Sequence, residues 1–348
     1  MNSSEIYTFL ESQKQLLGFA EIGLVSLNQS LIKSISSEFN SFDHSKYPAY
    51  LVNTLDQRKN PLIPYPWAKS IFICAYPFSL LPDLEWKLPE PKNAKFAGKV
   101  AGYATKMDYH FGGKDIFAKF ADNLNSFFAK SANGNFKTEI CIDTAPVAER
   151  TLALLSGIAT LGQNKSMLVA DFASGCFIGE IFTDLELSDE LFLCNQKLEK
   201  INQNCYSCGS CIKSCPTEAL NALEFNCSRC ISHLTMEKRG VLSLEERKLI
   251  GNWIFGCDNC TATCPGSNLP ESKNVDLEWL LFASSADIKK SIRSTALNYA
   301  GTTLLRRNAL AVLENYATES TLQLISRFSK VTGSEMLKET ANSILKRF

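Results

Sequence analysis

The 348-residue chain lacks several features that would place it in a class at once. It has no apolar run near the roughly 20 residues that a membrane-spanning helix needs, and its first residues lack the basic and apolar segments of a secretory signal. Lys+Arg and Asp+Glu balance at 36 each, so net charge does not indicate a nucleic-acid partner. No Gly-x-Gly-x-x-Gly sequence supports Rossmann-type binding of a nicotinamide or flavin. We expect a soluble cytoplasmic protein with no membrane partner.

Cysteine, by contrast, is abundant, with 13 residues, nine of them within residues 205–264. The block at 205–216 has two, two and three residues between successive cysteines and ends in Cys-Pro. A second block at 257–265 ends in the same way, and Cys227 and Cys230 lie between the two blocks. This is the spacing of bacterial ferredoxins, in which the fourth cysteine of a run ligates the other of two 4Fe–4S clusters.

The spacing predicts crossed ligation of two 4Fe–4S clusters, which need eight thiolates in total. The ligands of one cluster would be Cys205, Cys208, Cys211 and Cys264. The ligands of the other would be Cys215, Cys257, Cys260 and either Cys227 or Cys230, between which the spacing does not choose. Zinc also binds paired Cys-x-x-Cys sequences, but it explains neither the further cysteines at this spacing nor the repeated Cys-Pro. Disulfides are disfavoured because cytosolic thiols stay reduced.

Segments typical of strands and helices alternate up to about residue 190, which indicates an α/β domain. Strands are expected at 19–25, 70–76, 137–142, 167–170 and 176–182, and a helix at 146–155. After a polar connector at 185–204 and the cysteine blocks, the pattern becomes helical, at 288–299, 304–316, 321–328 and 335–345. The sequence predicts an α+β multidomain protein, with an α/β domain at 1–190, a ferredoxin-like two-cluster domain at 191–270 and a helical HEAT-like module at 271–348.

The helical tail is locally basic. Residues 286–348 contain ten Lys/Arg and five Asp/Glu, with Arg306 and Arg307 side by side. A solvated helix face is the simpler interpretation of this excess, and contact with nucleic-acid phosphates is the alternative.

Short stretches spread over almost the whole chain resemble those of a known family. The matching stretches are residues 56–61 (Asp-Gln-Arg-Lys-Asn-Pro), 103–110 (ending Asp-Tyr-His), 142–147 (Ile-Asp-Thr-Ala-Pro-Val), 179–185, 229–232 (Arg-Cys-Ile-Ser), 250–258 and 305–309. In this order around the cysteine blocks, they resemble the epoxyqueuosine reductases. That family reduces epoxyqueuosine to queuosine at the tRNA wobble position and uses cobalamin and two 4Fe–4S clusters.

The resemblance implies roles for individual residues. Cys230 takes the family's ligand position in Arg-Cys-Ile-Ser, and Asp143 that of the catalytic acid over the cobalamin face. The cobalamin contacts implied are Arg58, Asp143, Met167, Ile178, Ser232 and Asp258, and the α/β domain would bind this cofactor. The residues implied for contact between the helical module and the tRNA anticodon stem-loop are Arg293, Arg306 and Arg307. An external electron donor and a monomeric state are also expected.

Some of these residues have alternative interpretations. Asp143 follows a strand and precedes a helix, and on the residues alone a helix N-cap is the favoured interpretation. His110 lies in an Asp-x-His-x-x-Gly sequence, by which other cobalamin enzymes supply an axial histidine. The family resemblance implies no such ligand, so a hydrogen-bonded or substrate-pocket histidine is favoured.

The resulting hypothesis is that the clusters pass electrons singly to cobalamin and that Asp143 supplies a proton. One alternative is a corrinoid-dependent reductive dehalogenase, although such enzymes usually carry an export signal. Another is a non-catalytic iron–sulfur electron carrier, which cobalamin binding would distinguish from either enzyme.

Overall fold

The computed structural model describes residues 3–39, 49–93, 96–129, 136–187, 205–221 and 224–348. The chain folds into two compact units, each assembled from three stretches of sequence. Unit 1 consists of Met1–Leu81, Tyr109–Ser210 and Thr261–Leu269, and unit 2 of Pro82–Asp108, Cys211–Cys260 and Pro270–Phe348. These boundaries differ from the three consecutive domains expected, because composition changes along the chain do not reveal which distant stretches pack together. Most of the expected connector at 185–204 lies outside the described residues.

Unit 1 is built on a four-stranded sheet with the order β1-β2-β7-β4. The strands are β1 Glu21–Ser26, β2 Ser70–Pro77, β7 Cys176–Thr183 and β4 Thr138–Cys141. All neighbouring strands are antiparallel. The expectation of an α/β domain, whose sheet is mainly parallel, therefore needs correction. The alternation of strands and helices located the elements but did not reveal the direction in which the strands pair.

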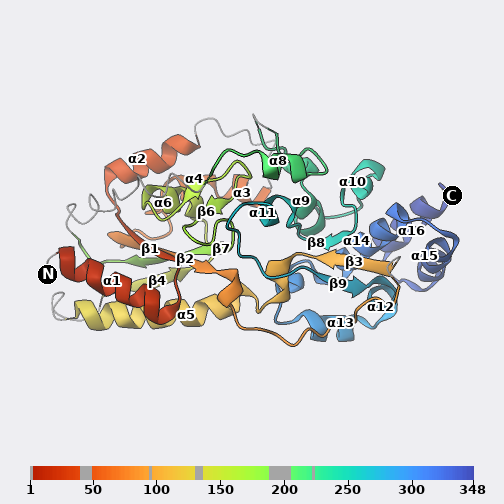
Figure 1. Ribbon diagram of the computed structural model, residues 1–348, viewed down its shortest axis with the longest axis horizontal. Helices are drawn as coiled ribbons and strands as arrows, with labels where there is room; N and C mark the ends of the chain where they lie inside the picture. The colour runs from red at the N-terminus through yellow and green to blue at the C-terminus, as the bar shows by residue number, and fades with distance from the viewer. Residues whose placement is uncertain (1–2, 40–48, 94–95, 130–135, 188–204, 222–223) are drawn as a thin grey trace. The chain divides into compact units, whose positions relative to one another are not determined.

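Helices cover both faces of this sheet (Figure 1). Helices α1 (Ser3–Leu17) and α5 (Tyr109–Phe128) lie on one face, and α2 (Gln29–Glu38) and α6 (Glu149–Leu155) on the other. Successive residues of a strand point to opposite faces, so Phe72 joins the core beneath α1 and α5 while Ile73 joins the core beneath α2 and α6. Burial on both faces explains why β2 is a continuous apolar run.

Shorter elements complete unit 1. They are α3 (Ala49–Asn53), α4 (Leu55–Lys59), the 3-10 turn η2 (Phe78–Leu80) and the two-stranded pair β5 (Thr160–Leu161) and β6 (Met167–Leu168).

Unit 2 contains a three-stranded sheet with the order β8-β3-β9. Its central strand β3 (Ala97–Val100) is parallel to β8 (Trp253–Phe255) and antiparallel to β9 (Lys273–Asp276). None of these three strands was predicted. Each is only three or four residues long, and β3 finds its partners far along the chain, so neither its length nor its local pattern distinguishes it from a loop.

Helices surround the sheet of unit 2. They are η4 (Gly102–Thr105), η7 (Cys227–Arg229), α9 (Ile231–Met236), α10 (Leu244–Leu249), α12 (Leu277–Phe282), α13 (Ser285–Ile292), η8 (Ala296–Tyr299), α14 (Gly301–Asn315), α15 (Glu319–Val331) and α16 (Glu335–Leu345). Two further short helices, α8 (Ser210–Ser214) and α11 (Asn259–Ala262), carry Cys211 and Cys260 of unit 2.

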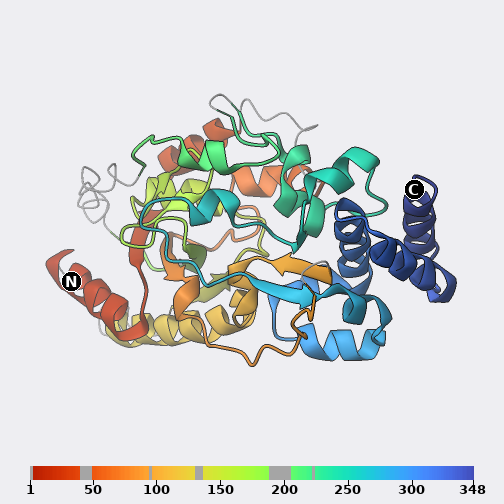
Figure 2. The same ribbon diagram turned by 45° about the vertical axis from the view of Figure 1, so that its right-hand side comes forward.

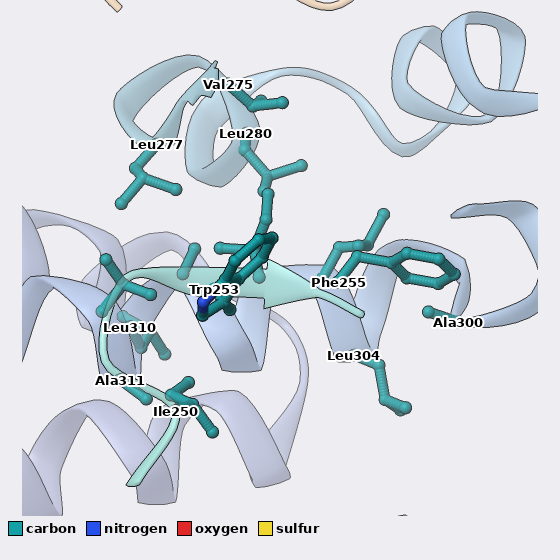
Figure 3. Packing of buried hydrophobic residues seen from close by; sticks show 14 of the residues in the cluster. Ile250, Trp253, Phe255, Val275, Leu277, Leu280, Ala300, Leu304, Leu310 and Ala311 are labelled. Carbon is teal, nitrogen blue, oxygen red and sulfur yellow. The ribbon is translucent and has the colours of Figure 1, made fainter. Parts of the chain in front are cut away.

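Helix α14 is the centre of the unit 2 core. Its side chains Leu304, Leu310 and Ala311 pack with Trp253 and Phe255 of β8 (Figure 3). Helices α15 and α16 lie side by side next to it (Figure 1 and Figure 2). All four predicted tail helices are present, the first divided into α13 and η8; their description as HEAT-like stays a prediction. None of the described helices has the length and apolarity to cross a membrane.

Candidate functional site

Asp143 lies in the loop after β4, with its backbone in the left-handed region at φ 58°. Its side chain is 56% exposed. The Tyr109 hydroxyl donates to Oδ2 at 2.5 Å, and Nε2 of His110 lies 3.6 Å from the same oxygen. The rings of Tyr109 and His110, which begin α5, stack with centroids 4.2 Å apart. A non-glycine residue persists at such a φ only where its surroundings hold it, a situation that is frequent at active sites.

The same contacts set the charge of Asp143. The interaction with His110 is the largest influence and lowers the pKa of Asp143, while burial opposes it and the Tyr109 hydrogen bond adds to the lowering. Asp143 is therefore a carboxylate at neutral pH in the substrate-free protein. It does not cap α6, whose N-cap residue is Ala148, so the helix-cap interpretation is wrong.

Two further carboxyl groups, which the sequence analysis did not select, lie close to Asp143. Glu149, in the first turn of α6, accepts the Asp143 main-chain N–H at Oε1 with a distance of 2.7 Å. Burial, followed by the charge of Asp143, raises the pKa of Glu149 to about 8. Glu180 of β7 is fully buried, and neither carboxyl oxygen has a hydrogen-bond partner among the described residues. Burial, then Glu149, raises the pKa of Glu180 well above its usual range.

Arg58 of α4 supplies positive charge to this group. Its Nη1 donates to the main-chain oxygen of Val147 at 2.6 Å, and its Nε donates to Thr54 Oγ1 at 3.0 Å. The Arg58 charge opposes the upward pKa shifts of Glu149 and Glu180. Arg58 thus contacts the segment between Asp143 and α6. The family resemblance implies cobalamin contact for both Arg58 and Asp143.

The other residues implied for cobalamin contact have different surroundings. Met167 of β6 and Ile178 of β7 are buried in the core beneath α2 and α6 of unit 1. Within unit 2, the Ser232 hydroxyl donates to the sulfur of Met236 at 3.4 Å. Asp258 accepts the Gly102 N–H at 2.7 Å, and burial raises its pKa.

Cysteines of unit 2 interact electrostatically as a group. Burial, then Cys230, Cys215 and Cys211, raises the pKa of Cys260 to about 12. The pKa of Cys257 is likewise raised to about 12, first by burial and then by Cys260 and Cys230. Buried thiolates that repel one another require compensating positive charge, which bound iron provides. Although no three His, Cys, Asp or Glu side chains of the described residues meet as ligands of a single ion, a 4Fe–4S cluster uses one cysteine at each of four irons.

The choice between Cys230 and Cys227 has a structural basis. Cys230 is the N-cap residue of α9, and although burial raises its pKa, the nearby main-chain amides of His233 and Ser232 oppose the rise. Amides at a helix N-terminus stabilise a thiolate. The pKa of Cys227 is raised to about 11 by burial and then by the charges of Cys230 and Glu237. The arrangement favours Cys230 as the ligand, as the family resemblance implied.

The position of Cys257 depends on the glycine before it. Gly256 has φ 65°, and a Cβ at this residue would come within 2.6 Å of the Ala101 Cβ. Its N–H donates to Thr235 Oγ1 at 3.1 Å. This bond links the end of β8 to α9 and so connects the segments that carry Cys257 and Cys230.

The first cysteine block has a curved backbone. Ser207 and Gly209 both have positive φ values, 50° and 71°, between Cys205 and Cys211. Such turns point successive main-chain amides toward one side and are frequent at Fe–S sites. The ligand set of Cys205, Cys208, Cys211 and Cys264 stays a prediction.

Arg307 requires a correction. Its side chain is fully buried in unit 2. Nη1 donates to the main-chain oxygens of Lys238 at 2.5 Å and Gly240 at 2.9 Å, and Nη2 to that of Leu234 at 2.8 Å. The prediction that Arg307 contacts phosphate is wrong, because its guanidinium is enclosed and bound to the backbone.

Arg306 and Arg293 differ from Arg307 in exposure. Arg306 is half-buried and donates to the main-chain oxygens of Leu280 and Ala283. Arg293, at the C-terminal end of α13, is exposed. Of the three arginines implied for RNA contact, Arg293 is the most exposed to solvent.

Comparison with known proteins agrees with this organisation. A family model described as a 4Fe-4S double cluster binding domain matches residues 204–267. Epoxyqueuosine reductase of Leadbetterella byssophila is 32% identical over 228 residues, which cover 66% of this chain and 68% of that protein. The chain belongs to the epoxyqueuosine reductase family. The resemblance inferred from the sequence is thereby confirmed, and so is the presence of a double-cluster domain in a mixed α/β protein.

Further family members show the same similarity. Epoxyqueuosine reductase of Shewanella oneidensis is 30% identical over 257 residues, and the match covers 70% of this chain but 63% of the length of that relative. A crystal structure of epoxyqueuosine reductase with an epoxyqueuosine-modified tyrosine tRNA stem loop has a TM-score of 0.73, at 21% identity over 99% of this chain and 90% of that chain. The family fold therefore extends over the described parts of both units.

Proposed function

We propose that this protein reduces epoxyqueuosine to queuosine in tRNA, with an anticodon stem-loop as its macromolecular partner. Membership of the epoxyqueuosine reductase family supports the reaction. The observation that carries the proposal is the exposed Asp143 carboxylate on a strained loop, contacted by Tyr109 and His110. Such a constellation presents a proton-transferring group to a substrate while fixing its orientation.

Two 4Fe–4S clusters would deliver electrons from an external one-electron donor. The proposed ligands of the first cluster are Cys205, Cys208, Cys211 and Cys264. Those of the second are Cys215, Cys230, Cys257 and Cys260. Support comes from the double-cluster family match and from the electrostatic grouping of the unit 2 cysteines. Main-chain amides of α9, which oppose the upward pKa shift that burial causes at Cys230, add to this support.

Cobalamin is the proposed second cofactor, and it would supply two-electron chemistry at its cobalt when bound. A corrin ring needs apolar surface and its amide arms need polar partners. Unit 1 has exposed Leu155 and Leu161 on α6 and β5. Its buried hydroxyls of Thr160 and Ser267 have no partner among the residues described. These features fit an amide-bearing cofactor, with Arg58 and Asp143 as its proposed polar neighbours.

The proposed role of Asp143 is to deliver a proton to the epoxide oxygen. Tyr109 and His110 hold the carboxylate in position. A bound modified base would displace water from this loop, and desolvation favours the protonated form of a carboxyl group. The base must leave its stack to reach the site, which suits an anticodon loop, whose bases can turn outward.

The test is a single-turnover reaction of the cluster-loaded, cobalamin-supplemented protein with a one-electron chemical reductant, followed by mass spectrometry of the tRNA nucleosides. Wild type is expected to convert epoxyqueuosine to queuosine. Asp143→Asn preserves the shape of the side chain but removes its proton, and should slow the reaction by about 100-fold or more. Its cluster and cobalamin spectra should match wild type. A wild-type protein that binds cobalamin but leaves epoxyqueuosine unchanged would disprove the proposal.

A further inference from the structure

The reaction needs more protons than one acid can give in a single step. Conversion of an epoxide to an alkene breaks two C–O bonds, forms one π bond and releases the oxygen as water. The balance is epoxide + 2 e⁻ + 2 H⁺ → alkene + H₂O, with the electrons supplied by the external one-electron donor through the clusters. Asp143 carries one carboxyl group, and it is ionised in the resting site. The reaction thus consumes one proton more than the Asp143 carboxyl can hold, and an acid next to Asp143 could supply it as a proton store.

We propose that Glu149 is this proton store, which reloads Asp143 during the reduction of epoxyqueuosine. The inference rests on the proposed function. Glu149 accepts the main-chain N–H of Asp143 through Oε1 at 2.7 Å, so its second carboxyl oxygen is free of that bond and can carry the proton. The same contact fixes the position of Glu149 relative to the loop that presents Asp143.

The charges around Glu149 determine which carboxyl group keeps a proton. Asp143 faces it from the loop after β4, Cys141 from the end of β4, Arg58 from α4, Arg150 from its own helix and Glu180 from β7. Three carboxyl groups thus share two arginines, and all three cannot ionise in a partly desolvated site without strong repulsion. Exposure orders them: Asp143 is exposed, Glu149 is half-buried, and Glu180 is fully buried.

The fold places these groups in that order. Glu180 points to the same face of the sheet as Ile178 and Phe182, beneath α6, because alternate residues of β7 share a face. Helix α6, which begins at Glu149, packs on β7. Neutral carboxyl groups therefore lead from the core toward the exposed carboxylate. Pairs of acids whose environments separate their pKa values commonly divide donor and acceptor roles in this way.

Glu149→Gln is the decisive variant. The Gln side-chain oxygen can still accept the Asp143 N–H, so the loop keeps its contact while the proton is lost. We expect a single-turnover rate lowered by about 10–100-fold below pH 8, because loss of a proton donor typically costs at least this much. The wild-type rate should fall as pH rises through about 8, where Glu149 loses its proton, and Glu149→Gln should lack this step.

A second measurement does not depend on cofactors. When the protein is titrated across pH 8, infrared difference spectra should show one carboxylic-acid C=O band that disappears with a midpoint at about pH 8. The band should be missing in Glu149→Gln and present in Glu139→Gln, a matched change at an exposed glutamate of β4. Its absence from wild type, or its persistence in Glu149→Gln, would overturn the assignment.

The outcomes separate the two proposals. If wild type does not reduce epoxyqueuosine, the proposed function fails whatever the infrared result. If wild type does reduce it, and Glu149→Gln has the same rate and pH profile, the proton store is refuted and the function stands.

Discussion

Replacement of Arg307 by methionine tests whether this arginine stabilises the fold or binds RNA. The change keeps an unbranched side chain of similar reach but removes the donors to the main-chain oxygens of Leu234, Lys238 and Gly240. Each buried acceptor left without a donor costs about 1–3 kcal/mol. Three such acceptors bring the total to at least about 3 kcal/mol. We expect a loss of about 3–5 kcal/mol, a large part of the roughly 5–15 kcal/mol that stabilises a typical domain.

Hydrogen–deuterium exchange is the suitable assay, because unfolding of a cluster-bearing protein is not a simple two-state equilibrium. Amides of α9 and α14 should exchange about 100-fold faster or more in Arg307→Met, since about 1.4 kcal/mol corresponds to a factor of ten. Arg293→Met is the matched control at an exposed site, where surface substitutions change stability by about 0.5 kcal/mol or less. Unchanged exchange in Arg307→Met, together with weaker tRNA binding, would refute the burial argument.

Three further predictions follow from the same structure. Two 4Fe–4S clusters contain about eight irons, and Cys230→Ala should lower the measured iron content below this number. Cys227→Ala should keep the wild-type iron content. The reverse result would make Cys227 the ligand in place of Cys230. Changing the exposed Lys289 of α13 and Arg293 at its C-terminal end to Gln should weaken tRNA binding. The dependence of log K on log salt concentration should become shallower by about one unit per lost phosphate contact. An unchanged slope would show that these residues do not contact RNA phosphates. The folded protein holds the Glu149 proton more tightly than the unfolded chain, so stability should fall as pH rises from about 4.5 to about 8 and then level off. Glu149→Gln should flatten this decline, measured as the pH dependence of hydrogen–deuterium exchange protection in unit 1.

The sequence located most of the elements of unit 1 and the tail, because their patterns are local. The apolar run of β2 and the helical period of residues 335–345 each depend on neighbours along the chain, and the structure has them as β2 and α16. Cysteine spacing was informative for a similar reason: a ferredoxin run wraps one short loop around a cluster. Strand direction and the pairing of β3 with β8 and β9 depend on distant contacts, and local pattern does not contain them.

The residues of the candidate site also differ in how far the sequence could identify them. Asp143 was identified through the family resemblance, and no local pattern separated it from a helix cap. Glu149 and Glu180 carried no signal, because a glutamate in a helix or a strand is ordinary until its burial is known. What makes them unusual is the meeting of β7, α6 and the Asp143 loop, which places acids from three separate segments in one charge group.

Burial of its side chains also changes the role expected for the helical tail. The Leu-Arg-Arg-Asn stretch at 305–308 was interpreted as a basic surface, yet the next side chain, Asn308, is as buried as Arg307. Its Nδ2 donates to the main-chain oxygens of Thr235 in α9 and Ile254 in β8. Helix α9 begins directly after Cys230, and β8 ends two residues before Cys257. Helix α14 therefore fixes two proposed ligands of the second cluster relative to each other. We therefore expect α14 to support the proposed second cluster, and we predict phosphate contact for exposed residues such as those of α13.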